Sequence, residues 1–144
     1  SLLNEAGAAH VVIDDGRIEG KVRAIAPGGV DAALELVGIP VLGDTLRCVR
    51  PGGMVSFTGS LTDVWSMKDF SPFGLIPSTV GLTVYNGQAW DLPAPVLQEV
   101  LDAVKAGEMS VPIAGVFNGL EQVPDAHRAL DSHAVPGKNV VVLG

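Results

Sequence analysis

The sequence predicts an α/β fold with a largely parallel sheet and helices on both faces. Short apolar runs alternate with amphipathic segments along the chain, and Gly or Pro residues separate them. Several of the runs are continuously apolar, as is typical of parallel strands covered on both sides. With 144 residues, of which 47% are hydrophobic, the chain is long enough for one domain with its own core.

The chain opens in a helical segment that ends at Gly7. The β-branched run His10 to Asp14 is followed by Asp15-Gly16, which predicts a buried strand and a turn. Apolar residues between Ile18 and Ile25 then fall on one face of a short helix. The apolar run Val30 to Val37 predicts the next strand.

Helical spacing of apolar residues predicts a helix from Val41 to Val49, which Pro51-Gly52-Gly53 ends. Met54 to Thr58 is predicted as a strand because it is apolar and rich in β-forming residues. The mixed stretch from Ser60 to Pro77 is interpreted as an irregular loop, and Val80 to Tyr85 as another strand.

The last third of the chain contains two predicted helices and two predicted strands. Pro93 to Ala106 is strongly amphipathic and is followed by Gly107, a typical C-terminal cap. A short strand is expected from Ile113 to Phe117. A helix from Leu120 to Ser132 and a final strand from Asn139 to Leu143 complete the chain.

Composition excludes several classes of function. The formal net charge of −7 disfavours binding to nucleic acid or an anionic membrane, since both need clustered Lys and Arg. A single cysteine, Cys48, and the lack of a long apolar run favour a soluble cytoplasmic protein. No metal site is predicted, because His10, His127, His133 and Cys48 show no recognisable zinc spacing.

Ligands of open parallel sheets bind beyond the carboxyl ends of the strands. The candidate site therefore comprises the loops after Val37, Thr58 and Tyr85. Gly38 and Gly59 each follow a predicted strand, where the missing Cβ lets a ligand approach backbone N–H groups that can hold a ribose or carboxamide. The alternative is that both glycines only make tight turns.

Five segments occur in a characteristic order: Glu5 to Asp14, Glu35-Leu36-Val37-Gly38, Arg50-Pro51-Gly52-Gly53, Phe57-Thr58-Gly59-Ser60, and Ala126 to Ser132 followed by Gly137 to Leu143. This order resembles the medium-chain dehydrogenase/reductase superfamily, in particular its zinc-independent quinone oxidoreductase branch. The resemblance covers nearly the whole chain. It implies that residues 1–144 are the C-terminal portion of a Rossmann-like dinucleotide-binding domain, and that the N-terminal catalytic domain is absent.

The resemblance implies a full-length NAD(P)H-dependent reductase that transfers hydride to a quinone, an enone or a similar activated molecule. NADP is the expected cofactor and NAD remains possible. No catalytic residue is assigned to this chain, which is expected to be inactive alone because it has no Gly-rich GxGxxG turn for the pyrophosphate. The implied cofactor-binding residues are Val37, Gly38, Phe57, Thr58, Gly59, Ser60, Tyr85, Lys138 and Asn139.

The implied strand order, 3-2-1-4-5-6, lacks its first two strands here. The strand His10 to Asp14 is then separated from the others, so we expect it to move next to another strand or to pair with another chain. The family also favours a homodimer formed through the strand Val80 to Tyr85.

Two alternatives remain. One is a stand-alone, non-catalytic nucleotide-binding or dimerisation module, whose composition would look the same. The other is an S-adenosylmethionine-dependent methyltransferase, which shares a helix ending in Leu-x-Pro-Gly-Gly but needs a Gly-rich loop and an acidic residue that this sequence does not supply.

Overall fold

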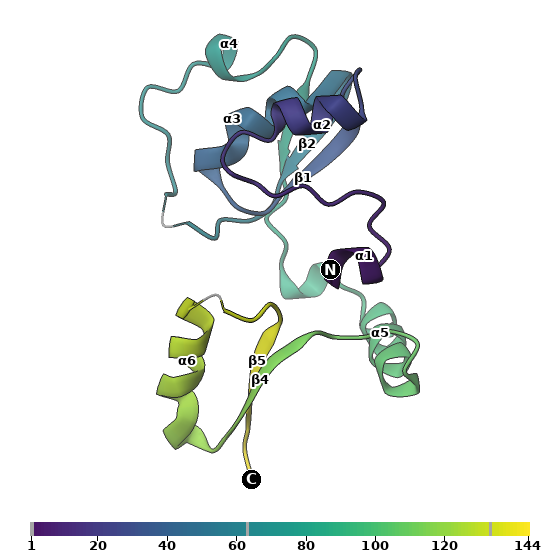
Figure 1. Ribbon diagram of the computed structural model, residues 1–144, viewed down its shortest axis with the longest axis vertical. Coiled ribbons are helices and arrows are strands. Elements are labelled where there is room, and N and C mark those ends of the chain that lie inside the picture. The colour runs from purple at the N-terminus through teal and green to yellow at the C-terminus, as the bar shows by residue number, and fades with distance from the viewer. Residues whose placement is uncertain (1, 63, 133) are drawn as a thin grey trace. The chain divides into compact units, whose positions relative to one another are not determined.

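The computed structural model describes residues 2–62, 64–132 and 134–144, and the chain forms two compact units, residues 1–87 and 88–144 (Figure 1). The first unit contains a parallel sheet in the order β1 (Val30–Glu35), β2 (Val49–Phe57), β3 (Gly81–Val84). In the second unit β4 (Ile113–Asn118) pairs in parallel with β5 (Lys138–Val142). The predicted α/β class with parallel strands is confirmed.

The core of the first unit lies between its sheet and helix α3 (Ile39–Cys48). Leu46 of this helix is fully buried, and so are Val49 and Val55 of β2. The parallel register places Ala33 beside Val55 and Val55 beside Leu82, so these three side chains share the face on which α3 packs. Burying a side chain such as Leu46 stabilises the fold by about 1.5–3 kcal/mol.

The opposite face of the same sheet is largely uncovered. Leu34 and Met54 lie on this face and are 62% and 53% exposed. The helix cover that the sequence predicts on both faces is therefore observed on one of them.

The predicted strand from His10 to Asp14 is wrong, because these residues belong to no strand. They also do not move next to another strand of the chain, and Ile13 is 76% exposed. A β-strand is stabilised by hydrogen bonds to a neighbour, and no strand among the described residues pairs with this segment. The segment instead runs as an extended connection between α1 (Leu2–Glu5) and α2 (Glu19–Ile25).

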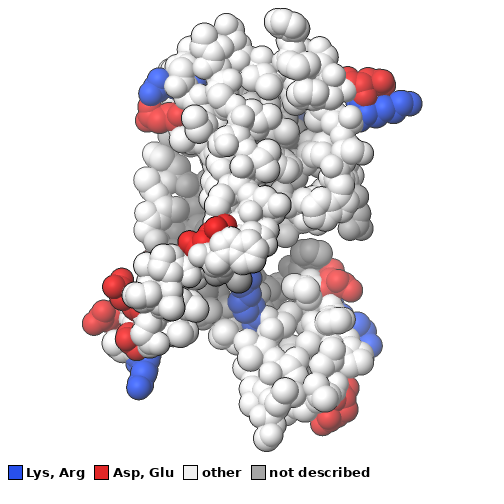
Figure 2. Space-filling view, turned by 180° about the vertical axis from the view of Figure 1, so that it is seen from behind, with Lys and Arg blue, Asp and Glu red and all other residues white. Residues whose placement is uncertain are grey.

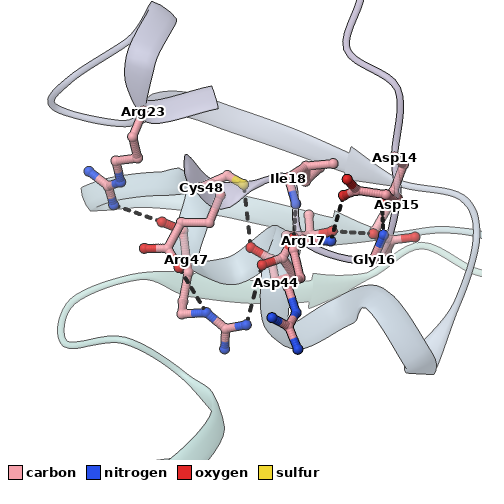
Figure 3. Close-up of polar contacts among 12 residues, drawn as sticks. Asp14, Asp15, Gly16, Arg17, Ile18, Arg23, Asp44, Arg47 and Cys48 are labelled. Atoms are coloured by element: carbon pink, nitrogen blue, oxygen red, sulfur yellow. Dashed lines mark hydrogen bonds and ion pairs between the residues drawn. The ribbon is translucent and has the colours of Figure 1, made fainter. Parts of the chain in front are cut away.

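Polar contacts at both ends of α2 fasten it to α3 (Figure 3). The N–H of Ile18, immediately before α2, donates to Oδ2 of Asp44 at 2.6 Å. Oδ1 of Asp44 pairs with Arg47, and Arg23 of α2 donates to the carbonyl oxygen of Arg47 at 2.7 Å. These bonds satisfy an N–H group at the start of α2 and hold the two helices together.

The stretch predicted as an irregular loop contains one short helix, α4 (Pro72–Leu75), which Ser71 caps through a hydrogen bond from Gly74 N–H. The aromatic residues of this stretch do not form a small core of their own, since Trp65 is 77% exposed and Phe73 is fully exposed.

The second unit follows the prediction closely. After the 3-10 turn η1 (Ala89–Asp91), helix α5 (Ala94–Ala106) ends at Gly107, whose φ of 76° is the left-handed conformation expected of a glycine cap. The turn η2 (Leu120–Gln122) leads into α6 (Val123–Ser132), which packs on β4 and β5. No helix in the described parts of the chain is long and apolar enough to cross a membrane.

Candidate functional site

The carboxyl ends of β1, β2 and β3 meet at one edge of the first sheet. Glu35 and Phe57, near the ends of β1 and β2, are register partners, and Phe57 is in turn the partner of Val84. The N–H of Tyr85 donates to the carbonyl oxygen of Phe57 at 3.0 Å, and the N–H of Leu61 donates to that of Val37 at 2.9 Å. The three loops predicted from the sequence therefore lie together.

Seven of the nine predicted cofactor-binding residues belong to this edge: Val37, Gly38, Phe57, Thr58, Gly59, Ser60 and Tyr85. The other two, Lys138 and Asn139, lie on β5 of the second unit, where Lys138 is exposed and Asn139 is half-buried. The role of these two residues stays a prediction.

The two glycines of the edge are required by contacts within the chain. Gly38 has φ +127°, and a Cβ added there would lie 3.0 Å from Oγ1 of Thr62. A Cβ on Gly59 would lie 2.6 Å from the carbonyl oxygen of Leu36, closer than real side chains come. The interpretation as tight turns thus explains both glycines, and a contact with a ligand stays a prediction.

The carboxylate of Glu35 is the most highly connected group at this edge. Glu35 is only 4% exposed, and its Oε1 accepts N–H bonds from Val37 at 2.7 Å and Gly38 at 3.0 Å. Its Oε2 accepts the hydroxyl of Thr45 at 2.5 Å. In the sequence, Glu35 interrupts the apolar run Val30 to Val37 near its end, and an acid in such a position is a signal of a buried polar contact.

Backbone N–H groups at this edge are already used by the protein. Val37 and Gly38 donate to the Glu35 side chain, while Thr58 and Gly59 donate to its main-chain oxygen at 2.9 Å and 3.2 Å. The N–H groups of Gly38 and Gly59 therefore each have an acceptor within the chain, and their contact with a ligand stays a prediction.

Hydroxyl groups and apolar surface remain for a ligand. Oγ1 of Thr58 lies 3.3 Å from Oγ of Ser56, and Ser60 donates its hydroxyl to the carbonyl oxygen of Thr62 at 2.7 Å. Val37 is 38% exposed and Tyr85 is 52% exposed. This combination suits a neutral ligand with rings and hydroxyls, because no residue named here supplies a positive charge for a phosphate.

The buried hydroxyl Oγ1 of Thr62 has no hydrogen-bond partner among the residues that the structure describes. Buried polar atoms are usually paired, so this hydroxyl is an exception. Thr62 faces the Cβ position of Gly38, at the junction of the two loops.

A cavity of about 590 Å³ borders β1. Its lining runs along β1 and the following loop and includes residues of α2, α3 and the N-terminal segment: Leu3, Val12, Asp14, Ile18, Val22, Val30, Ala33, Leu34, Glu35, Leu36, Val37, Thr45 and Cys48. Burial, together with the nearby carboxylates of Asp44 and Glu19, raises the pKa of the Cys48 thiol to about 11. The lining is mostly apolar.

Within residues 2–62, 64–132 and 134–144, no group of three or more His, Cys, Asp and Glu side chains is arranged to hold a metal ion. His133, one of the histidines considered in the sequence, lies outside the described residues.

A family model described as zinc-binding dehydrogenase matches residues 6–141. The chain belongs to the zinc-binding dehydrogenase family. The described residues of this family member do not fit a zinc site, because no three His, Cys, Asp or Glu side chains among them cluster. A curated relative, a probable quinone oxidoreductase from Leishmania amazonensis, is 28% identical over 155 residues, which cover 98% of this chain and 45% of the relative.

Solved structures agree with this assignment. The crystal structure of AibC has a TM-score of 0.77 at 27% identity and covers 99% of this chain, while this chain covers 38% of AibC. A mycobacterial protein solved in complex with NADPH has a TM-score of 0.71 at 21% identity, with 99% of this chain and 44% of that protein covered. The resemblance to the quinone oxidoreductase-like branch of the medium-chain dehydrogenases is confirmed, and the chain spans less than half the length of these relatives.

Proposed function

We propose that this chain is the C-terminal portion of the nucleotide-binding domain of an NAD(P)H-dependent oxidoreductase. The full-length enzyme transfers hydride to a quinone, an enone or a similar activated small molecule. The observation that carries the proposal is the meeting of three predicted cofactor loops at the carboxyl edge of one parallel sheet, in a chain of this family. The 28% sequence identity to a probable quinone oxidoreductase supports this class of substrate.

The chain's own residues bind and orient the cofactor. The hydroxyls of Thr58 and Ser60 hydrogen-bond the ribose or the carboxamide of the nicotinamide, and Val37 and Tyr85 contact its apolar surfaces. When bound, the nicotinamide supplies the hydride. Lys138 and Asn139 are proposed as further contacts, from the family resemblance. NADP is favoured over NAD on the same ground.

The isolated chain is proposed to be inactive. A dinucleotide needs a Gly-rich turn at a helix N-terminus to hold its pyrophosphate, and the sequence contains no GxGxxG. Among the described residues, one side of β1 pairs with no strand, and β1 borders the apolar cavity. This supports the view that further strands of the domain cover this region in the full-length protein.

The proposal includes a homodimer formed through the strand Val80 to Tyr85. β3 is the last strand of its sheet, and Val84 is 69% exposed there. Pairing of two such edges across a two-fold axis satisfies unpaired backbone groups and extends the sheet. A cytoplasmic location is also proposed, in keeping with the single, unpaired and buried Cys48.

The test uses the full reading frame that carries this chain, purified and assayed for oxidation of NADPH and of NADH with 1,4-benzoquinone as acceptor. We expect quinone-dependent oxidation with a lower KM for NADPH, and none by the 144-residue chain. The variant Thr58→Val should raise the KM for the cofactor, whereas Thr83→Val, in β3 of the same sheet, serves as a matched control. Binding of NADPH by the 144-residue chain without any oxidation by the longer protein would favour the stand-alone module instead.

A further inference from the structure

We propose that Glu35 is a positioning residue that fixes the Val37–Gly38 turn against the Phe57–Ser60 turn and so sets the shape of the cofactor edge. This inference rests on the proposed function. It assigns a role to a residue that does not itself contact the cofactor.

The side chain of Glu35 holds the first turn from inside the protein. One carboxylate oxygen accepts the N–H groups of Val37 and Gly38 at 2.7 Å and 3.0 Å, so the two residues after β1 are tied to the strand that precedes them. The other oxygen accepts the hydroxyl of Thr45, in the middle of α3. The carboxylate therefore connects the turn to the helix that follows it.

The main chain of Glu35 holds the second turn. Its carbonyl oxygen accepts the N–H groups of Thr58 and Gly59, the first two residues after β2. One residue thus receives five hydrogen bonds from two loops and a helix, and both turns carry predicted cofactor contacts.

The two turns also fit closely against each other, so a shift in one is transmitted to the other. The missing side chain of Gly59 leaves room for the carbonyl of Leu36, and that of Gly38 leaves room for Thr62 and Ser60. Close packing of this kind leaves no slack at the junction.

The burial of Glu35 explains why a hydrogen-bonding side chain is needed at this position. A carboxylate that is 4% exposed is costly to bury unless it is hydrogen-bonded, and three donors surround this one. An apolar side chain would leave the N–H groups of Val37 and Gly38 without acceptors. The turn would then rearrange to find other partners.

The test compares two conservative variants in the full-length protein. Glu35→Gln keeps the length and a carbonyl acceptor for Val37 and Gly38, and its amide can donate to the Thr45 hydroxyl. Glu35→Asp keeps the charge but shortens the side chain, which withdraws the acceptor from the turn. Asp31→Asn is the matched control, because Asp31 lies on the same strand with its side chain 87% exposed.

We expect Glu35→Asp to raise the KM for NADPH by about tenfold, with kcat changed by less than about twofold. A tenfold change is the size of the effect expected when a buried N–H donor of the turn loses its acceptor. Glu35→Gln should stay within about threefold of the wild type, and Asp31→Asn should match it. Thr45→Val, which removes a single donor and preserves shape, should raise the KM by about threefold and provides a second measurement should Glu35→Asp fold poorly.

The reverse order, a large defect in Glu35→Gln and none in Glu35→Asp, would show that the charge rather than the geometry matters and would overturn the proposal. So would an unchanged KM in Glu35→Asp and Thr45→Val. Wild-type protein that neither binds nor oxidises NADPH or NADH would instead reject the proposed function, which separates the two failures.

Discussion

The N–H of Ile18 and the carboxylate of Asp44 form a 2.6 Å hydrogen bond between residues 26 positions apart in the sequence. The side chain of Asp44 is only 11% exposed and also pairs with Arg47. The Asp44 carboxylate therefore anchors the segment that leads into α2. That segment pairs with no strand among the described residues.

Replacing Asp44 with Ala should destabilise the chain by about 1–3 kcal/mol, because the Ile18 N–H loses its acceptor in a partly buried place. Urea unfolding followed by circular dichroism measures this. Asp31→Asn, which removes an exposed charge paired with Arg50, should change stability by less than about 1 kcal/mol. Equal effects of the two changes would contradict the anchoring role.

Gly59→Ala should destabilise the chain by more than about 1 kcal/mol, since the added methyl meets the carbonyl of Leu36 at 2.6 Å. Gly20 offers a matched control, because it lies in α2 with nothing within 4 Å of its Cβ position. Gly20→Ala should stabilise the chain by up to about 1 kcal/mol through helix propensity. Thermal unfolding of both variants checks the contrast, and a harmless Gly59→Ala would disprove the close approach.

Stability should fall as the pH rises through the range from 9 to about 11. Burial raises the pKa of the Cys48 thiol in the folded chain from 9.0 to about 11, so the unfolded chain loses this proton first and is favoured. Below pH 9 the thiol is protonated in both states, and the contribution is fully present. The difference in unfolding free energy between wild type and Cys48→Ala, measured at several pH values, isolates this effect from other titrations; a constant difference from pH 8 to 11 would contradict it.

Val84→Pro should convert the proposed dimer of the chain to a monomer. The N–H of Tyr85 points to Phe57 of β2, so the N–H of Val84, one residue earlier, points to the free edge of β3. Proline removes that donor without touching the β2 side. Light scattering should give a molecular mass of twice 14.8 kDa for the wild type and for Val84→Thr, and a mass of 14.8 kDa for Val84→Pro. A monomeric wild type would contradict the dimer proposal.

Much of the fold could be predicted from the sequence because the relevant signals are local. The amphipathic run before Gly107 predicted α5 and its cap, and the residues after Val30 and around Val55 predicted paired strands. Local signals also misplaced one boundary. Pro51-Gly52-Gly53 was expected to precede a strand, but β2 begins at Val49, and the register shifts opposite Val30 and Ala32 to accommodate these residues.

The sequence could not predict features that depend on a neighbouring strand or on a hydrogen-bond partner elsewhere in the fold. His10 to Asp14 has the composition of a strand, but composition does not provide the neighbour that a strand needs. Similarly, the glycines at 38 and 59 marked the right loops, yet the acceptor that occupies their N–H groups is Glu35, whose contacts depend on three-dimensional register. The candidate loops were thus predictable, and the network that shapes them was not.

The bare sheet face made by Leu34 and Met54 exposes apolar side chains through which copies of this polypeptide can meet at high concentration. Apolar side chains that meet water on a flat, regularly spaced surface attract one another between molecules as readily as within one. On the face drawn in Figure 2 the charged side chains lie in scattered groups between uncharged residues. The colloidal stability of the polypeptide will therefore depend on the −7 net charge, which keeps copies apart at low ionic strength and is screened by salt. A purification buffer of low salt and a pH well above 4.7 suits this polypeptide better than a physiological one.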